Sequence, residues 1–228
     1  MNFNYPALNI LVEKAAGIDD LRWGMASLAE HANSRHLSDE WKKTVAAQSI
    51  SCGREWAEQI RGQYPVQSPA EILKQWKIPV VLQQYKDPEK SKLIQFAQYK
   101  GGSVYVSNNM VATIRRQTQM WNLEAYLGNF DPFFILASHE LFHHVEAHNP
   151  EIITRTMKIP GCGMLRKSGC PYMASEIGAF AFAKELSGIS FYPRILEVIG
   201  IYDKLPERAE QIVEEAFLQN TEGTEKRR

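Results

Sequence analysis

The segment that most constrains the fold is an apolar run that carries two histidines and a glutamate near its end. Residues 133–145 read Phe-Phe-Ile-Leu-Ala-Ser-His-Glu-Leu-Phe-His-His-Val. A helix that is apolar on nearly all sides belongs in a protein core. Ionisable side chains in such a helix are costly unless something satisfies them. The run therefore predicts a buried helix in which His139, Glu140 and His143 form part of a site.

These three residues have the H-E-x-x-H spacing. His139 and His143 are four positions apart, so their imidazoles share one face of a helix and can reach one ion. Glu140 is close enough to act on a water molecule at that ion without being a ligand itself. Two neutral imidazoles, an open coordination position and a neighbouring carboxylate are typical of a hydrolytic zinc site. We expect one Zn²⁺ per chain, with Glu140 as the catalytic base.

Two histidines need a third ligand to hold zinc well. The metzincin pattern would need glycine at position 146 and histidine at position 149, where this chain has Glu146 and Asn149. A glutamate from a later helix is the other common solution, and residues 175–186 predict such a helix. Glu176 begins an otherwise small and apolar face of it, near the expected helix start, where a carboxylate is favoured. Weaker candidates for the third ligand are Glu146, His148, Glu151 and Glu185.

The motif helix and the later helix together resemble the ImmA/IrrE metallopeptidase family. The resemblance rests on H-E-L-x-H at 139–143 and on E-x-x-A-x-x-F-A-x-x-L at 176–186, and it covers roughly residues 68–190. It implies a thermolysin-like minimal core with a bacterial or phage-borne cytosolic protease activity. It also implies that a specific protein, for example a transcriptional repressor, is the substrate. The residue roles that it implies are zinc ligation by His139, His143 and Glu176, and base catalysis by Glu140.

Two departures from the family pattern motivate an alternative function. Phe142 stands where the family usually has glycine, and the stretch 144–175 between the ligand-bearing helices is long. A bulky residue and an insertion could close the cleft, which would suit a zinc-binding regulator that is catalytically silent or needs a partner. A third hypothesis is a helical interaction protein in which the motif is accidental.

A peptidase also needs a residue that stabilises the oxyanion. The sequence offers four candidates for this role and does not choose among them: His144, His148, Tyr172 and Tyr192.

The remaining patterns predict an α+β fold that is mostly helical with a small β-sheet. Residues 1–66 read as helices that we expect to pack on the core at 67–190, and residues 191–228 predict two further helices and a frayed tail. Ser68 and Glu71 form a capping box, residues 78–82 form a strand, and Gly101-Gly102 joins a hairpin. Asn108 or Asn109 should cap the next helix. We expect the strand at 103–107 to be the edge that holds an extended substrate.

Composition limits the partners and the compartment. Lys+Arg and Asp+Glu both total 26, so no excess of positive charge predicts nucleic-acid binding. No stretch reaches the roughly 18 apolar residues of a membrane span, and the start of the chain lacks the features of a signal peptide. We therefore expect a cytoplasmic protein without a membrane partner. Three cysteines agree: Cys52 is expected in the core, and Cys162 and Cys170 as reduced thiols rather than a disulfide.

Overall fold

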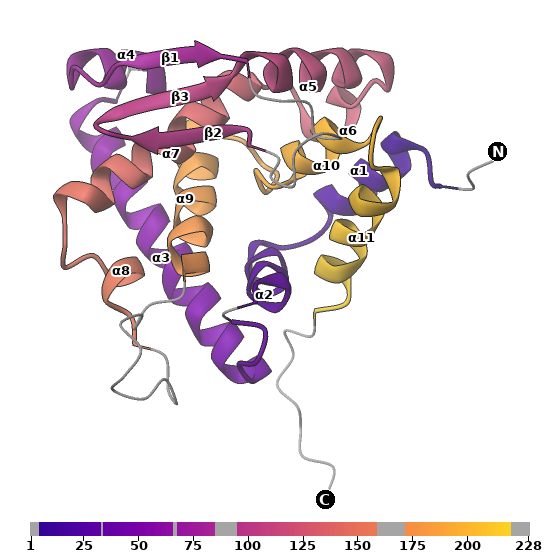
Figure 1. The fold of residues 1–228 in the computed structure, drawn as a ribbon, viewed down its shortest axis with the longest axis horizontal. Helices are drawn as coiled ribbons and strands as arrows, with labels where there is room; N and C mark the ends of the chain where they lie inside the picture. The colour runs from indigo at the N-terminus through magenta and orange to yellow at the C-terminus, as the bar shows by residue number, and fades with distance from the viewer. Residues whose placement is uncertain (1–4, 33, 66–67, 85–94, 159–171, 220–228) are drawn as a thin grey trace, which may run out of the picture.

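The computed structural model describes residues 5–32, 34–65, 68–84, 95–158 and 172–219. Most of this chain is helical, and it contains a three-stranded mixed sheet, so the predicted α+β class is confirmed. Figure 1 shows the sheet at one end of the molecule, with α3 and α9 running away from it. The N-terminal helices are α1 (Leu8–Ala16), α2 (Asp20–Glu30) and α3 (Asp39–Gln63). The C-terminal ones are α10 (Ile195–Ile201) and α11 (Pro206–Phe217), close to the predicted positions.

The sheet corrects one prediction from the sequence. Its strands are β1 (Val80–Gln83), β2 (Ala97–Lys100) and β3 (Ser103–Ser107), in the order β1-β3-β2. The predicted hairpin between β2 and β3 is confirmed, with positive φ at Gly101 and Gly102. β3 is nevertheless the central strand, because β1 pairs with it in parallel on the other side. Residues 103–107 therefore cannot be the free edge, and the edge strand beside the motif helix is β2.

Side chains cap the starts of α3 and of the two helices that follow it, and the predicted capping box is confirmed. The hydroxyl of Ser38 accepts the Trp41 N–H at the start of α3. The capping box is complete at α4 (Pro69–Gln75), where the Glu71 side chain accepts the Ser68 N–H. α5 (Asn108–Met120) begins one residue earlier than predicted, because Ser107 and not an asparagine caps it. Side-chain caps thus determine the starts of α3, α4 and α5.

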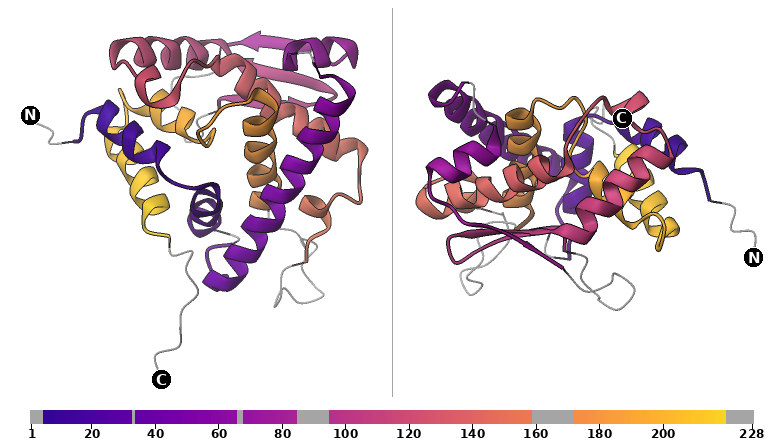
Figure 2. Two further views of the ribbon diagram at one scale, coloured as in Figure 1. Left: turned by 180° about the vertical axis from the view of Figure 1, so that it is seen from behind. Right: turned by 90° about the horizontal axis from the view of Figure 1, so that it is seen from above.

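The predicted core helix is α7 (Pro132–His148), preceded by α6 (Glu124–Leu127) and followed by α8 (Ile153–Thr156). Its apolar residues pack against one face of the sheet, through Val104 and Val106 of β3. The right-hand view of Figure 2 shows the helices gathered on that side of the sheet. The sheet and α7 together make one apolar cluster, and this cluster supports the polar residues of the motif.

The second helix of the predicted site is α9 (Tyr172–Ser187), which lies between α7 and α3. It is helical already at Tyr172, so Glu176 lies beyond the first turn, contrary to the prediction. Close packing requires glycine at two points: a Cβ on Gly53 of α3 would lie 2.1 Å from the Gly178 carbonyl oxygen, and one on Gly178 would meet the Phe142 ring at 3.0 Å. These contacts bring α9 close to both neighbouring helices.

Two remaining expectations from the sequence concern cysteines and membranes. Cys52 is buried in α3, as predicted, whereas Cys162 and Cys170 lie outside the described residues. Within the described ranges, no helix combines the length and the apolar character needed to span a membrane.

Candidate metal centre

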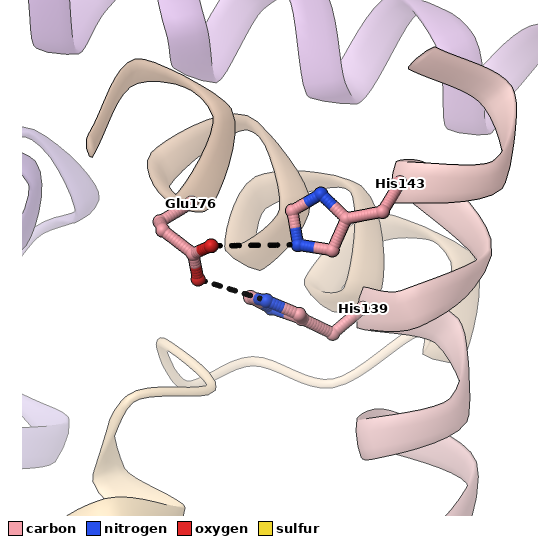
Figure 3. A group of neighbouring side chains, drawn as sticks. All are labelled: His139, His143 and Glu176. Atoms are coloured by element: carbon pink, nitrogen blue, oxygen red, sulfur yellow. Dashed lines mark hydrogen bonds and ion pairs between the residues drawn. The ribbon is translucent and has the colours of Figure 1, made fainter. Parts of the chain in front are cut away.

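The packing of α9 on α7 brings together the three side chains predicted as metal ligands. His139 and His143 project from successive turns of α7 toward Glu176 of α9 (Figure 3). The Nε2 atom of His139 lies 3.2 Å from Oε2 of Glu176, and that of His143 lies 3.5 Å from Oε1. One ligand atom from each residue lies within 4.8 Å of the other two. Both imidazoles therefore present the same nitrogen to one carboxylate.

This spacing fits a zinc ion. Ligand atoms at 2.0–2.1 Å from a tetrahedral zinc lie about 3.3 Å from one another. The two distances between imidazole nitrogen and carboxylate oxygen, 3.2 and 3.5 Å, bracket that value. The donor set of two imidazoles and one carboxylate is also that of hydrolytic zinc sites with an open fourth position. His139, His143 and Glu176 could accordingly hold Zn²⁺ with little rearrangement.

The charges within the site are strongly coupled. Burial alone would raise the pKa of Glu176, but the hydrogen bond and charge of His139, with the charge of His143 and the Tyr172 hydroxyl, lower it to about 2. Burial alone would lower the pKa of His143, but Glu146, Glu176 and Glu140 outweigh it and raise the value to about 9. The site thus has a surplus of negative charge, which favours a cation.

The two histidines differ at their second ring nitrogen. Nδ1 of His143 lies 3.0 Å from Oε2 of Glu146, a buried side chain one turn further along α7. Nδ1 of His139 is buried and has no hydrogen-bond partner among the described residues, and the His139 ring packs on Phe180 at 4.6 Å between centroids. A hydrogen bond therefore fixes the orientation of His143, whereas apolar packing fixes that of His139.

Glu140 is positioned for a role other than ligation. Its side chain is buried and borders the same cleft as the three candidate ligands. Burial raises its pKa, and the charge of Glu176 acts in the same direction, while the histidines and a hydrogen bond from the Tyr99 main chain oppose it. A carboxylate with a raised pKa beside a cation site is suited to accept and return a proton.

The cleft that contains the site has a volume of about 540 Å³. The edge strand β2 forms one wall of the cleft, and the start of α10 together with the residues before it forms another. Its apolar lining comes from Phe96, Leu136, Phe180 and Leu196. Phe142 does not reach the cleft, because its fully buried ring packs on Phe182 in the core. Phe142, whose bulk motivates the hypothesis of a closed cleft, therefore does not block the cleft.

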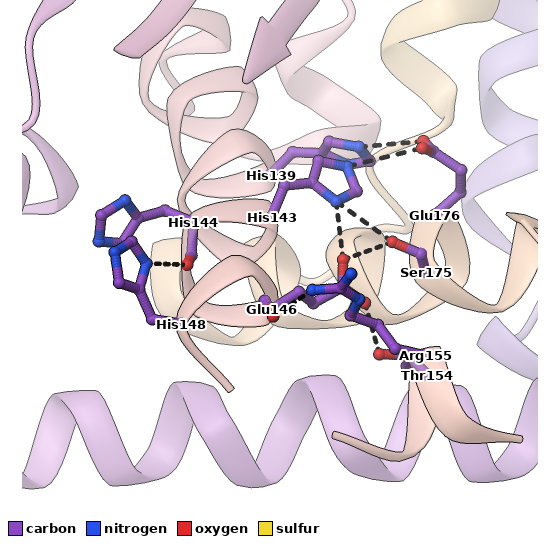
Figure 4. Close-up of polar contacts among 9 residues, drawn as sticks. All are labelled: His139, His143, His144, Glu146, His148, Thr154, Arg155, Ser175 and Glu176. Carbon is purple, nitrogen blue, oxygen red and sulfur yellow. Dashed lines mark hydrogen bonds and ion pairs between the residues drawn. The ribbon is translucent and has the colours of Figure 1, made fainter. Parts of the chain in front are cut away.

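The candidates that the sequence leaves open separate clearly in space. Of the four residues considered for oxyanion stabilisation, Tyr172 borders the cleft, and its hydroxyl bonds Glu176. Tyr192 is buried and stacks on Trp23 instead. His144 and His148 lie on the opposite side of α7 from the candidate ligands (Figure 4).

The rival third ligands are also placed elsewhere. Glu146 bonds the outer nitrogen of His143 rather than facing the ion position, and Glu185 pairs with Arg61 at 2.6 Å. Glu151 is exposed beyond the end of α7. Sequence reasoning did not identify the bond between Glu146 and His143, although their spacing of three residues on one helix is a readable signal. The contact of Tyr99 with Glu140 has no such signal, because it depends on how the sheet docks.

No protein-family model, curated protein or solved structure matches this chain.

Proposed function

We propose that this chain is a zinc-dependent metallopeptidase, a divergent member of the ImmA/IrrE family. The observation that supports this most is the approach of one buried carboxylate to two Nε2 atoms at 3.2 and 3.5 Å, with Glu140 in the same cleft. His139, His143 and Glu176 would hold the ion. We further propose that this protein is cytoplasmic and that its substrate is a specific intracellular protein, such as a transcriptional repressor.

The reaction is hydrolysis of a peptide bond. When bound, the ion would lower the pKa of water toward neutrality and polarise the scissile carbonyl. Glu140 accepts a proton from the attacking water molecule and delivers it to the leaving amine. The Tyr99 main chain, which hydrogen-bonds Glu140, holds this carboxylate toward the cleft.

Among the described strands, none pairs with the outer edge of β2, so this edge provides a means of binding an extended peptide. Ser107 donates its N–H to the Phe96 carbonyl, so polar main-chain groups of alternate residues point toward β3. Those of Ala97 and Tyr99 consequently point away from β3, along the wall of the cleft, where the Tyr99 N–H already donates to Glu140. A substrate strand can add to such an edge by main-chain hydrogen bonds, which suits a protein substrate with an unfolded segment.

Tyr172 is the residue that we propose for stabilising the oxyanion. Its phenol borders the cleft and bonds Glu176, and burial together with the Glu176 charge raises its pKa, so the hydroxyl keeps its proton. A neutral phenol beside the ligand carboxylate can donate to a developing oxyanion.

The test combines metal content with proteolysis. Elemental mass spectrometry of the purified protein should find about one zinc per chain. Unfolded casein and a panel of repressor proteins are then incubated with the wild type and with Glu140→Gln as the matched inactive control. Cleavage by the wild type alone supports the peptidase.

Each failure has a separate meaning. Zinc without cleavage of any protein favours the silent or partner-activated regulator. Absence of zinc, even after zinc is offered, contradicts the metal site and leaves a helical interaction protein.

A further inference from the structure

Glu146 is a buried carboxylate that joins three helices around the candidate ligands (Figure 4). Its Oε2 atom accepts a hydrogen bond from the Ser175 hydroxyl of α9 and lies 3.0 Å from Nδ1 of His143 on α7. Its Oε1 atom accepts a hydrogen bond from the Thr154 hydroxyl of α8. Its main-chain carbonyl accepts another from Arg155, also of α8, at 2.8 Å. Side-chain donors from all three helices therefore meet on one residue.

These donors explain how a carboxylate can be buried here. Only 5% of Glu146 is exposed, and an unpaired charge at such a position would be costly. The imidazole of His143 and the hydroxyls of Ser175 and Thr154 surround the carboxylate and compensate for its burial. The side chain is accordingly a charged acceptor. Hydrogen bonds to a charged acceptor are the stronger kind, so they restrain their donors well.

The bond to His143 determines which ring nitrogen is free. A proton on Nδ1, directed at the Glu146 carboxylate, leaves the Nε2 lone pair toward Glu176 once the ring is neutral. His139 has no comparable partner at Nδ1 within the described chain. Orientation by hydrogen bonding thus acts on one of the two candidate histidine ligands.

The bond to Ser175 concerns the third ligand. Ser175 directly precedes Glu176, its hydroxyl donates to the same Oε2 atom that faces His143, and its oxygen lies 3.2 Å from Nδ1 of His143. One carboxylate oxygen therefore links the imidazole of one ligand to the residue adjoining another.

We propose that Glu146 is a positioning residue that holds the Nδ1–H form of His143 and, through Ser175, keeps Glu176 within reach of both histidines. This inference rests on the proposed zinc site. It assigns Glu146 no contact with the metal and no part in the chemical step.

Zinc affinity, measured by competition with a chromophoric chelator, tests the inference without a substrate. Glu146→Ala should lower the affinity by about 10- to 100-fold, the usual effect of removing a partner of a ligand histidine. Glu146→Gln keeps an acceptor oxygen for Nδ1–H and should recover part of the loss. Ser175→Ala should cost about tenfold, as expected at the low end for one hydrogen bond to a charged group. Glu151→Gln, a change of an exposed acid in the segment that follows α7, is the matched control and should bind zinc like the wild type.

A spectroscopic readout separates positioning from a purely structural role. Long-range ¹H–¹⁵N correlation spectra of the zinc-loaded wild type should show a proton on Nδ1 of His143 and the metal on Nε2. Metal on Nδ1 would overturn the inference even if no Glu146 variant folds. So would a folded Glu146→Ala protein that binds zinc within about twofold of the wild type. A wild type that binds no zinc would instead defeat the metal site itself.

Discussion

Helix α7 carries two pairs of histidines with identical spacing. His139 and His143, the front pair, face Glu176, and His144 and His148, the back pair, lie on the opposite side of the helix (Figure 4). The front rings are edge to face with centroids 5.1 Å apart, whereas the back rings lie 4.2 Å apart at a shallow angle. The difference arises from what each pair meets on other elements.

In the part of the chain that the structure describes, no carboxylate completes a site around the back pair. Nδ1 of His144 bonds the Tyr99 hydroxyl, and its ring packs near Trp76. Nδ1 of His148 bonds the His144 carbonyl, and the side chain is exposed. Within the described ranges, the front pair with Glu176 is the group of three or more ligands close enough for one ion. A helical His-x-x-x-His spacing is therefore common to both pairs, and the third ligand distinguishes them.

Removing that third ligand should have the largest effect. We expect Glu176→Ala to lose stoichiometric zinc and with it all hydrolysis, because two imidazoles alone hold zinc poorly. His144→Ala and His148→Ala are the matched controls and should each retain about one zinc per chain. Elemental mass spectrometry of the three variants measures this. Zinc that survives Glu176→Ala but is lost from either control would place the metal on the back pair.

The pairs also differ in the residue that follows their first histidine, which is Glu140 in front and Val145 behind. Glu140→Gln should keep zinc and lower kcat by about 10²- to 10⁴-fold, the usual contribution of a general base. Steady-state cleavage of the substrate found in the proteolysis screen, with metal content determined in parallel, measures this. Full activity in the variant would remove Glu140 from the proton-transfer role.

What could be predicted from the sequence depends on how local the cause is. The buried motif helix, the capping box at Ser68 and the Gly101-Gly102 turn follow from neighbouring residues, and each is confirmed. The central position of β3 could not be predicted, because the parallel pairing of β1 involves residues more than twenty positions away. Local patterns therefore identified the ligand candidates but not the strand that borders them.

The same limit applies within the candidate site. Glu146 and Glu176 are both acids that the sequence offers as third ligands. Helix packing separates them, since α9 brings Glu176 to the inner nitrogens while Glu146 meets the outer nitrogen of His143. From the sequence alone, either acid could contact His143. Only the placement of α9 against α7 determines which acid meets which nitrogen.

Titration of His143 in the front pair and of His144 in the back pair should affect stability with opposite signs. In the metal-free protein, the pKa of His143 is about 9, above its ordinary value of about 6.5, so its stabilising effect is complete below pH 6.5 and is lost as the pH rises through 9. Burial and the neighbouring His148 lower the pKa of His144, so its contribution is complete above pH 6.5 and is lost as the pH falls. Urea unfolding of the metal-free protein across this range measures both effects. The loss of unfolding free energy at high pH should be absent from His143→Ala, and the loss at low pH should be absent from His144→Ala.

The pH dependence of zinc affinity should reveal the proton that His143 carries in the metal-free protein. Between pH 7 and 9, an ion that binds Nε2 of His143 must displace a proton, so the apparent affinity should rise about tenfold per pH unit. Calorimetry in buffers of different ionisation enthalpy counts the protons released. An affinity that is flat over this range would contradict a protonated His143 in the metal-free site.

The smallest expected effect concerns a contact that links the two faces of α7. Tyr99 bonds His144 through its hydroxyl at 3.0 Å and Glu140 through its main chain. Tyr99→Phe removes the hydroxyl and keeps the ring, so it should cost about 1 kcal/mol of unfolding free energy or less, because the bond is partly exposed. Zinc affinity should stay unchanged, since no ligand is touched.

Tyr105→Phe is the matched control for Tyr99, because the pairing of Tyr105 with Gln98 puts its side chain on the other face of the sheet. A fall in kcat/KM for Tyr99→Phe alone, at constant zinc affinity, would mean that the back pair positions the edge strand and the Glu140 carboxylate. The two faces of the helix would then be coupled through one residue of β2. Equal activity in both variants would make the back pair a packing feature, and the chemistry would belong entirely to the front.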